Sequence, residues 1–179
     1  MGDNSMAFMV NDSAEKRLAF LESLAKPVGD LQAQASEEAN LYTTYFGFKV
    51  QEGRSFNIVE KVRAGFSMAA GKKLASHLGV EPKVLFIRYL GMSRSTVIRR
   101  EKQPKPRLNP DESDKLVRYA YLLSQATRLM EGHEEAAQEW LASPSPALGG
   151  QTPLECATTE VGARRVEDLI TSLEYGMFS

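Results

Sequence analysis

Apolar residues recur every three or four positions from about residue 56 to the end of the chain, which is the spacing of helices that bury one face. The pattern predicts helices at residues 58–64, 69–78, 82–90, 94–101, 110–131, 134–142 and 159–174. Few runs show the two-residue alternation that is typical of a half-buried strand. We therefore predict an all-α fold.

Polar residues sharpen the predicted starts of two helices. Asn109 is followed by Pro110 and then by Glu112, which is the signature of a capping box. In such a box, the cap residue and the glutamate each bind the other's backbone N–H group. Thr152 and Glu155 repeat the arrangement further along the chain. The two signals predict helix starts just after residues 109 and 152.

The first 40 residues differ from the rest because they are mostly polar and are broken by Pro27 and Gly29. Residues 13–25 have helical spacing, which suits either a short helix or an arm that becomes ordered on binding. An apolar patch follows at residues 42–50. We expect three parts: a partly flexible N-terminal extension (1–40), a first helical domain (41–107) and a second helical domain (108–179).

Charge is unevenly distributed, although the whole chain has a net charge of only −1. Residues 60–109 carry 12 Lys or Arg against 3 Glu, a net charge of +9. Residues 110–179 carry 5 Lys or Arg against 12 Asp or Glu, a net charge of −7. Such blocks are often only solvated surface. A basic block beside an acidic block nevertheless favours two partners of different chemistry.

Residues 84–100 have the pattern of a helix-turn-helix. Gly91 supplies the small residue at which the chain reverses between two short helices. Apolar side chains that would lock the two helices together are Phe86, Ile87, Leu90, Met92 and Val97. Ile87 is a departure, since bacterial helix-turn-helix proteins usually have alanine at this point of close approach. A larger residue predicts a wider packing angle.

The second helix of this pair would turn a polar, cationic face away from the core. Hydroxyl groups near its start suit base edges in a major groove, and the arginines suit phosphates. The predicted DNA-binding residues are Ser93, Arg94, Ser95, Thr96, Arg99, Arg100 and Lys102. Lys105 and Arg107 would also lie near phosphates. The alternative is an αα-hairpin with a basic surface and no role in binding DNA.

The acidic half contains a more specific motif. Residues 140–154, with the sequence WLASPSPALGGQTPL, resemble the toxin-binding domain of the Xre/MbcA/ParS-like antitoxins. Residues 108–116, 160–169 and 174–176 match the same family. The resemblance extends from about residue 41 to the end of the chain, so it implies nothing about residues 1–40.

The resemblance implies that an Xre-like helix-turn-helix domain precedes a C-terminal toxin-binding domain. It also implies the function of such proteins, which is that of the antitoxin in a type II toxin–antitoxin system. The antitoxin binds and blocks the active site of a RES-domain toxin, an enzyme that consumes NAD, and represses the shared promoter. The implied partners are the cognate toxin, operator DNA and a second copy of the chain in a homodimer.

The resemblance places the toxin contacts in one loop and in the C-terminal tail. The residues concerned are Leu148, Gly149, Gly150, Gln151, Thr152, Glu174, Tyr175, Gly176, Met177 and Phe178. Prolines before the loop would lower the entropy lost on binding, and aromatic residues often dominate interfaces. We expect the tail to enter the toxin's NAD pocket, with Glu174 or the terminal carboxylate facing cations. The plainer interpretations are a structural helix connection for the loop and a core cap for Tyr175.

Residues that could carry catalysis are scarce. His77 and His133 lie in different modules, and the single cysteine, Cys156, has no obvious base near it in the sequence. Metal sites need several suitable ligands, and no such cluster is apparent. We therefore expect neither enzymatic activity nor a cofactor.

The location of the protein can also be predicted. One cysteine cannot form an internal disulfide, and no apolar run reaches the ~20 residues of a membrane-spanning helix. Residues 1–10 lack the pattern of a secretion signal. We expect a cytoplasmic protein.

Two other functions stay open. The chain could be a stand-alone helix-turn-helix regulator whose acidic half dimerises or senses a small ligand. It could also be a protein-binding module with no role in binding DNA.

Overall fold

The regular secondary structure described in the chain is helical, and one isolated antiparallel bridge joins Ser67 to Arg107. The computed structural model describes residues 40–47 and 57–176, which belong to one unit that begins at Asn40. The predicted all-α fold is confirmed. The expectations for residues 1–39 lie outside the described residues.

The helices follow one another in the order that the apolar spacing predicts. After a helical segment at residues 40–46 come α3 (Ile58–Ala64), α4 (Met68–His77), α5 (Pro82–Val84), the π-helix η1 (Leu85–Tyr89), α6 (Arg94–Glu101), α7 (Pro110–Leu129), α8 (Glu134–Ala142), the 3-10 helix η2 (Pro146–Leu148), α9 (Pro153–Cys156) and α10 (Glu160–Glu174). Most predicted bounds are met to within one or two residues. The helix predicted at residues 82–90 is divided into α5 and η1.

Both predicted capping boxes are present. Asn109 Oδ1 accepts a hydrogen bond from the N–H of Glu112 at 2.8 Å, and Glu112 Oε2 accepts one from the N–H of Asn109 at 2.8 Å. Thr152 and Glu155 form the same reciprocal pair, with both hydrogen bonds at 3.1 Å. The starts of α7 and α9 are therefore fixed by side chains close to them in the sequence.

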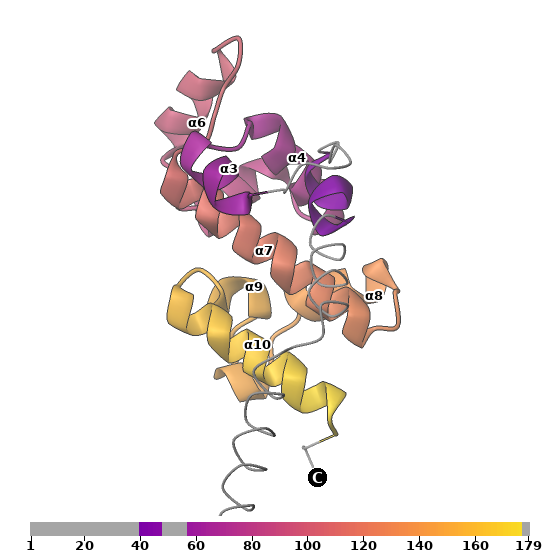
Figure 1. Cartoon of the computed structure of the whole chain (residues 1–179). Helices are drawn as coiled ribbons and strands as arrows, with labels where there is room; N and C mark the ends of the chain where they lie inside the picture. The colour runs from indigo at the N-terminus through magenta and orange to yellow at the C-terminus, as the bar shows by residue number, and fades with distance from the viewer. Residues whose placement is uncertain (1–39, 48–56, 177–179) are drawn as a thin grey trace, which may run out of the picture. The chain divides into compact units, whose positions relative to one another are not determined.

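The unit is arranged around α7. This helix runs between α3 and α4 on one side and α8, α9 and α10 on the other (Figure 1). Its fully buried apolar side chains are Leu116, Tyr119, Ala120, Leu122, Leu123 and Ala126. Its 20 residues span about 30 Å at 1.5 Å per residue. One helix therefore lines the core of both halves of the unit, the first formed by the helices before α7 and the second by the helices after it.

The helical segment at residues 40–46 also belongs to this core. Tyr42, Tyr45 and Phe46 are buried. The ring of Phe46 lies 4.8 Å from that of Phe66, and the ring of Tyr45 lies 5.2 Å from that of His77. The start of the predicted apolar patch therefore packs against the helix-turn-helix half.

A close helix contact in this half joins Gly71 of α4 to Phe86 of η1. A Cβ atom at Gly71 would lie only 2.6 Å from Phe86 Cε1. Ile87, the large residue from which a wider packing angle was predicted, is half-buried and packs against the core. In η1 the N–H of Leu90 donates to the carbonyl of Leu85 at 2.9 Å, the wider spacing of a π-turn. The close approach of the Phe86 ring to α4 therefore requires a residue as small as glycine at position 71.

Replacing Gly71 with alanine should lower the free energy of unfolding by about 1–3 kcal/mol, the usual cost of overpacking a core. The added methyl group must displace the buried Phe86 ring, although alanine otherwise suits a helix better than glycine. Urea denaturation followed by circular dichroism measures the change.

The exposed residue Ser76 on the same helix provides the control, because Ser76→Ala should change stability by less than about 0.5 kcal/mol. The penalty of Gly71→Ala should shrink in a Phe86→Leu background, where the ring is absent. An equal penalty with and without the ring would contradict the close contact.

Candidate functional site

The start of α6 is a cluster of hydroxyl groups. Ser93 Oγ accepts a hydrogen bond from the N–H of Thr96 at 3.1 Å and so caps the helix. Ser93 Oγ also lies 3.0 Å from Ser95 Oγ and 2.8 Å from Thr96 Oγ1. Val97, the next residue along the helix, is buried at 2% exposure. The predicted hydroxyl residues therefore lie together at the N-terminal end of α6.

The predicted cations on and after α6 are of two kinds. Arg94, Arg99 and Lys102 are exposed, and within the described ranges none of them forms an ion pair. Arg100 instead pairs with Glu112 at the start of α7, and these two side chains are only 16% and 11% exposed. Arg100 therefore joins α6 to α7 and has little surface left for DNA.

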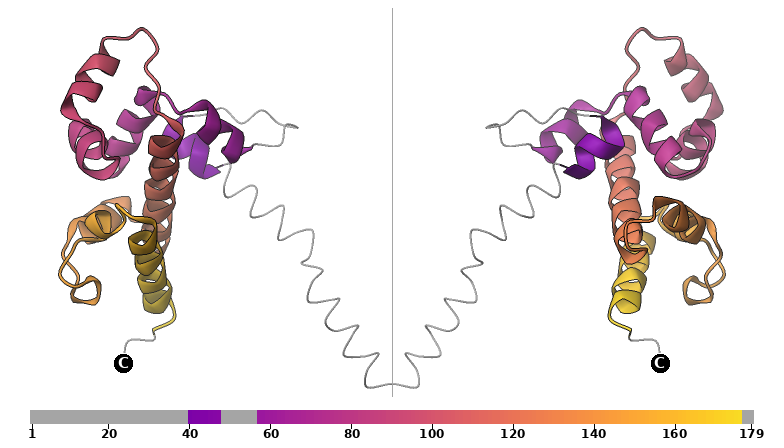
Figure 2. Two further views of the ribbon diagram at one scale, coloured as in Figure 1. Left: turned by 90° about the vertical axis from the view of Figure 1, so that its left-hand side faces the viewer. Right: turned by 90° about the vertical axis from the view of Figure 1, so that its right-hand side faces the viewer.

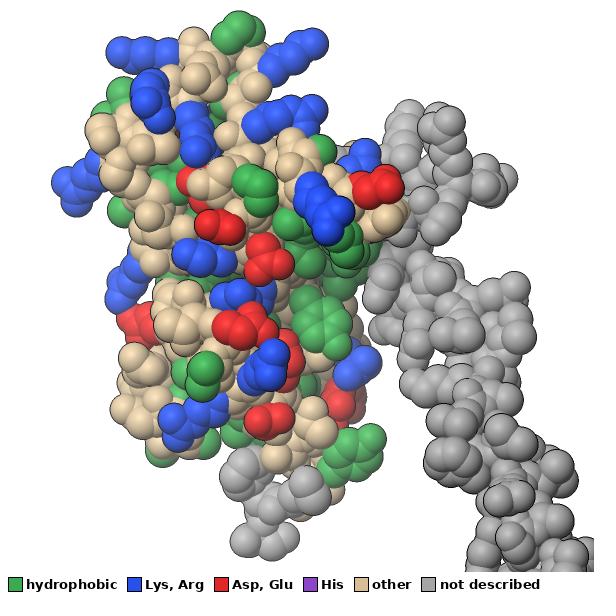
Figure 3. Space-filling model, turned by 60° about the vertical axis from the view of Figure 1, so that its left-hand side comes forward, with side chains coloured by type: hydrophobic (Ala, Val, Ile, Leu, Met, Phe, Trp, Pro, Cys, Tyr) green, Lys and Arg blue, Asp and Glu red, His purple; other side chains and the backbone are tan. Residues whose placement is uncertain are grey.

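Cations gather on the surface around α6. Figure 3 shows Lys and Arg side chains over the upper part of one face, whereas carboxylates are mixed with them lower down. Lys83 and Lys105 are also exposed. Arg107 is exposed as well, but its guanidinium donates to the carbonyls of Ala64 and Gly65 at 3.3 and 2.7 Å, so part of its hydrogen-bonding capacity is already used. Lys83 and Lys105 therefore add positive charge to the surface around α6.

An apolar groove of about 480 Å³ lies between the α5–η1 segment and α6. Its lining residues are Lys83, Val84, Ile87, Arg88, Arg94, Val97, Ile98 and Glu101. Ile98 is 56% exposed on the outer face of α6. Ile98 is not among the residues predicted to bind DNA.

The loop between α8 and α9 is closed by its own backbone. The N–H of Ser145 donates to the carbonyl of Gln151 at 3.0 Å, and that of Gly150 donates to the carbonyl of Ser145 at 2.9 Å. Gly149 and Gly150 have φ angles of 69° and 82°, and a Cβ atom on either would meet nothing within 4 Å. The left-handed backbone, not lack of space, therefore favours glycine here.

The ends of this loop are anchored, and its tip is exposed. Leu148 is buried at 2% exposure, and Thr152 Oγ1 caps α9. The backbone N–H of Thr152 holds the pKa of Glu155 below its ordinary value, and the nearby Arg88 adds to this effect. Of the predicted toxin-binding residues in the loop, those at 149–151 are freely exposed.

The predicted tail residues begin at the end of α10. Glu174 Oε1 lies 3.0 Å from Arg128 Nε, so Glu174 ties this end of α10 to α7. Tyr175 is 75% exposed, which excludes the core-cap interpretation. Gly176 is exposed with a φ angle of 62°. The remaining predicted tail residues lie outside the described part of the chain: Met177 and Phe178.

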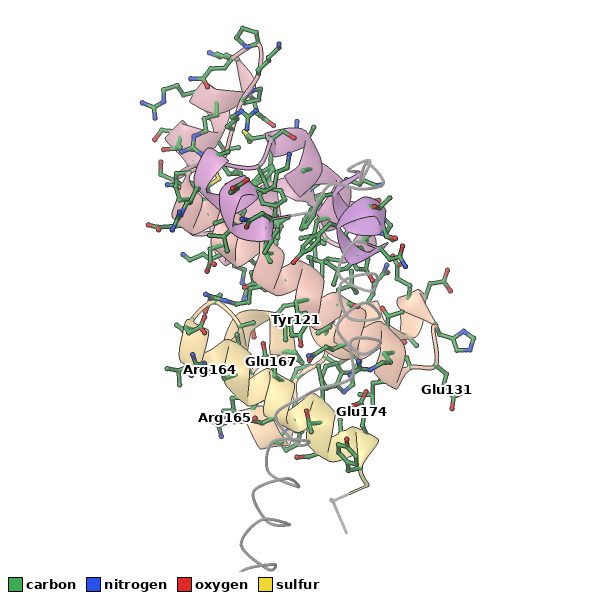
Figure 4. All side chains as sticks on the ribbon, in the orientation of Figure 1. Tyr121, Glu131, Arg164, Arg165, Glu167 and Glu174 are labelled. Carbon is green, nitrogen blue, oxygen red and sulfur yellow. The ribbon has the colours of Figure 1, made fainter. Side chains whose placement is uncertain are left out.

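The loop and the tail lie near each other without forming one cluster. Arg165 of α10 donates to the carbonyl of Ala147 at 3.3 Å, which fixes the loop against the middle of that helix. Arg165 and Glu174 are separated by nine residues, or about 14 Å along a helix, and point out from different parts of α10 (Figure 4). Figure 2 shows that both loop and tail lie at the end of the unit remote from α6.

The candidate catalytic residues are not brought together. His77 Nδ1 lies 2.8 Å from Glu134 Oε1 and joins α4 to α8, whereas His133 is exposed at the start of α8 and Cys156 is buried in α9. Within residues 40–47 and 57–176 there is no group of three or more His, Cys, Asp or Glu side chains that could hold a metal ion. Across the same residues, every helix is too short or too polar to span a bilayer.

Two families of known domains match the chain. Residues 58–121 match the antitoxin Xre-like helix-turn-helix domain. Residues 125–176 match the antitoxin Xre/MbcA/ParS C-terminal toxin-binding domain. The two matches meet inside α7, the helix that lines both halves of the core.

Curated proteins resemble the chain over greater lengths. An Antitoxin Xre from Yersinia enterocolitica is 32% identical over 123 residues, which is 68% of this chain and 81% of that protein. An Antitoxin Xre from Photorhabdus laumondii is 33% identical over 42% of this chain and 51% of its own length. A Prs ADP-ribosylating antitoxin from a Sphingobium species is 25% identical over 85% of this chain and 100% of its own length.

Removing the buried guanidinium by Arg100→Ala should lower the free energy of unfolding by about 1–3 kcal/mol. The reason is that Glu112 would stay largely buried while losing its cationic partner. Arg99→Ala is the matched control on the same helix. Because Arg99 is exposed, this substitution should change the free energy of unfolding by less than about 0.5 kcal/mol. Urea unfolding compares the two variants. Equal stabilities would show that the Arg100 pair has no structural role.

Proposed function

The chain belongs to the Xre family of antitoxins, and on this premise we propose that it neutralises an NAD-consuming RES-domain toxin and represses its own promoter. One observation carries the proposal: the cationic face of α6 and the exposed loop and tail lie at opposite ends of the unit (Figure 2). Because the two surfaces are separate, one chain can bind DNA and a toxin at the same time.

The proposed DNA-binding domain comprises residues 41–107. Its contact residues are the hydroxyl cluster together with the exposed cations: Ser93, Arg94, Ser95, Thr96, Arg99 and Lys102. A helix start with exposed hydroxyls and arginines suits base edges, and cations beside it suit phosphates. Arg100 has a positioning role, since its pair with Glu112 holds α6 against α7. A homodimer would present two copies of α6 to successive turns of the major groove.

The proposed toxin-binding domain comprises residues 108–179. Its contacts are the backbone and Gln151 side chain at the loop tip, together with Tyr175 and the tail beyond it. Leu148 and Thr152 anchor the loop, and Glu174 anchors the base of the tail. The relative from Sphingobium is named for ADP-ribosylation, a reaction that consumes NAD, which supports a toxin of NAD chemistry. The expected location is the cytoplasm, where NAD and the promoter are found.

The double substitution Arg94→Ala with Arg99→Ala should weaken binding to the protein's own promoter at least tenfold. It should also reduce the slope of log K against log salt by about 2, or about 1 for each lost phosphate contact. Fluorescence anisotropy at several salt concentrations measures both quantities.

Arg164→Ala serves as the control because Arg164 is an exposed arginine on α10, remote from α6 (Figure 4). This variant should retain the affinity and the salt slope of the wild type. If the double variant did the same, the assignment of α6 to DNA would be wrong.

Tyr175→Ala and a truncation lacking residues 177–179 should each raise the concentration of antitoxin needed to inhibit the toxin by at least tenfold. Exposed aromatic anchors typically dominate binding energy at an interface. The assay follows NAD consumption by the purified product of the neighbouring gene.

Tyr121→Ala is the matched control, since Tyr121 is a half-exposed tyrosine on α7. Full inhibition of the toxin by both tail variants would show that the tail does not contribute to the interface with the toxin. Absence of inhibition by the wild-type protein would instead refute the RES-toxin assignment.

A further inference from the structure

Ile98 is an exposed apolar residue in the middle of the cationic face of α6. Its side chain is 56% exposed, whereas the adjacent Val97 is 2% exposed. Arg94 lies four residues before Ile98 and Lys102 lies four residues after it, so the three side chains share one face of the helix. Single exposed apolar residues are common on protein surfaces. Here the residue lies where the proposed function places DNA.

Ile98 is also continuous with apolar surface on the preceding helices. It lines the groove of about 480 Å³ together with Val84 and Ile87. Lys83 and Arg94 line the same groove. The apolar surface is therefore small, contiguous and surrounded by positive charge.

The major-groove edge of a base pair carries one apolar group, the 5-methyl group of thymine. Guanine and cytosine lack this methyl group and present mainly hydrogen-bonding atoms to a helix in this groove. We propose that Ile98 packs against the 5-methyl group of a thymine and so determines the operator's preference for an A·T pair at that position. The proposal rests on the DNA-binding function proposed above and names the residue that gives it sequence specificity.

The surroundings of Ile98 favour DNA over a protein as the occupant of this surface. Glu101 is the one carboxylate among the groove residues, and it pairs with Lys72 at 3.2 Å. Arg94 and Arg99 remain unpaired within the described residues and flank Ile98 on its own helix. DNA can place a thymine methyl group against Ile98 and phosphates beside Arg94 and Arg99.

The test compares two versions of the protein's own promoter fragment, one with thymine and one with uracil at every thymine position. The uracil version lacks only the 5-methyl groups. The wild-type protein should bind it about fourfold more weakly for each methyl group that Ile98 covers. Ile98→Ala should bind both versions alike, with about the affinity of the wild type for the uracil version. Fluorescence anisotropy measures all four affinities.

Two further variants separate the methyl contact from general effects of uracil on the DNA. Ser95→Ala removes a proposed polar DNA contact on the same helix, so it should weaken binding to both versions while the ratio of the two affinities stays that of the wild type. Ile98→Val retains most of the branched surface and should keep most of that preference. Because Ile98 is exposed, these variants should fold, and thermal unfolding followed by circular dichroism verifies this.

Three results would overturn the inference. If Ile98→Ala kept the full preference for thymine, Ile98 would not read the methyl group, while the DNA-binding function would stand. If, in addition to keeping that preference, Ile98→Ala changed the oligomeric state measured by light scattering, Ile98 and its groove would belong to a protein interface. If the wild type bound its promoter no better than a shuffled fragment, the DNA-binding function itself would fail, and the inference with it.

Discussion

The fold depends on the burial of one helix, α7, by both halves of the unit. Leu116 and Leu123 illustrate the arrangement, since both are fully buried within a single 20-residue helix. Burying a leucine-sized side chain contributes about 1.5–3 kcal/mol, whereas an isolated helix of this length is only marginally stable in water. The helix-turn-helix match and the toxin-binding match meet inside α7 for the same physical reason. Neither half has a complete core without this helix.

Polar contacts hold the two halves in a fixed relation around α7. Arg88 of η1 pairs with Glu155 of α9, and His77 of α4 lies 2.8 Å from Glu134 of α8. The buried hydroxyl of Tyr119 donates to the carbonyl of Leu154 at 3.1 Å, and burial raises the pKa of this tyrosine, so it remains a donor at neutral pH. The separation between α6 and the end that holds the α8–α9 loop and Tyr175 is therefore a property of the fold and not of a flexible linker.

Much of this structure could be predicted from the sequence because its determinants are local. Asn109 and Thr152 cap their helices through residues three positions away, and Ser93 caps α6 in the same manner. The apolar spacing predicted the helices because one buried face is needed wherever a helix packs. The motif around Gly149 and Gly150 indicated the family, which the matched domains and relatives confirm.

The tertiary structure decided which residues of the candidate sites are free to act. Arg99 and Arg100 are neighbours in the same basic run, yet Arg100 is paired with Glu112 of the next helix while Arg99 is exposed. Leu148 lies in the recognised loop motif, but its side chain is buried. The sequence by itself determined the helices, their caps and the family. The availability of each side chain depends on contacts between separate helices, which no local spacing encodes, so only the packing around α7 could decide it.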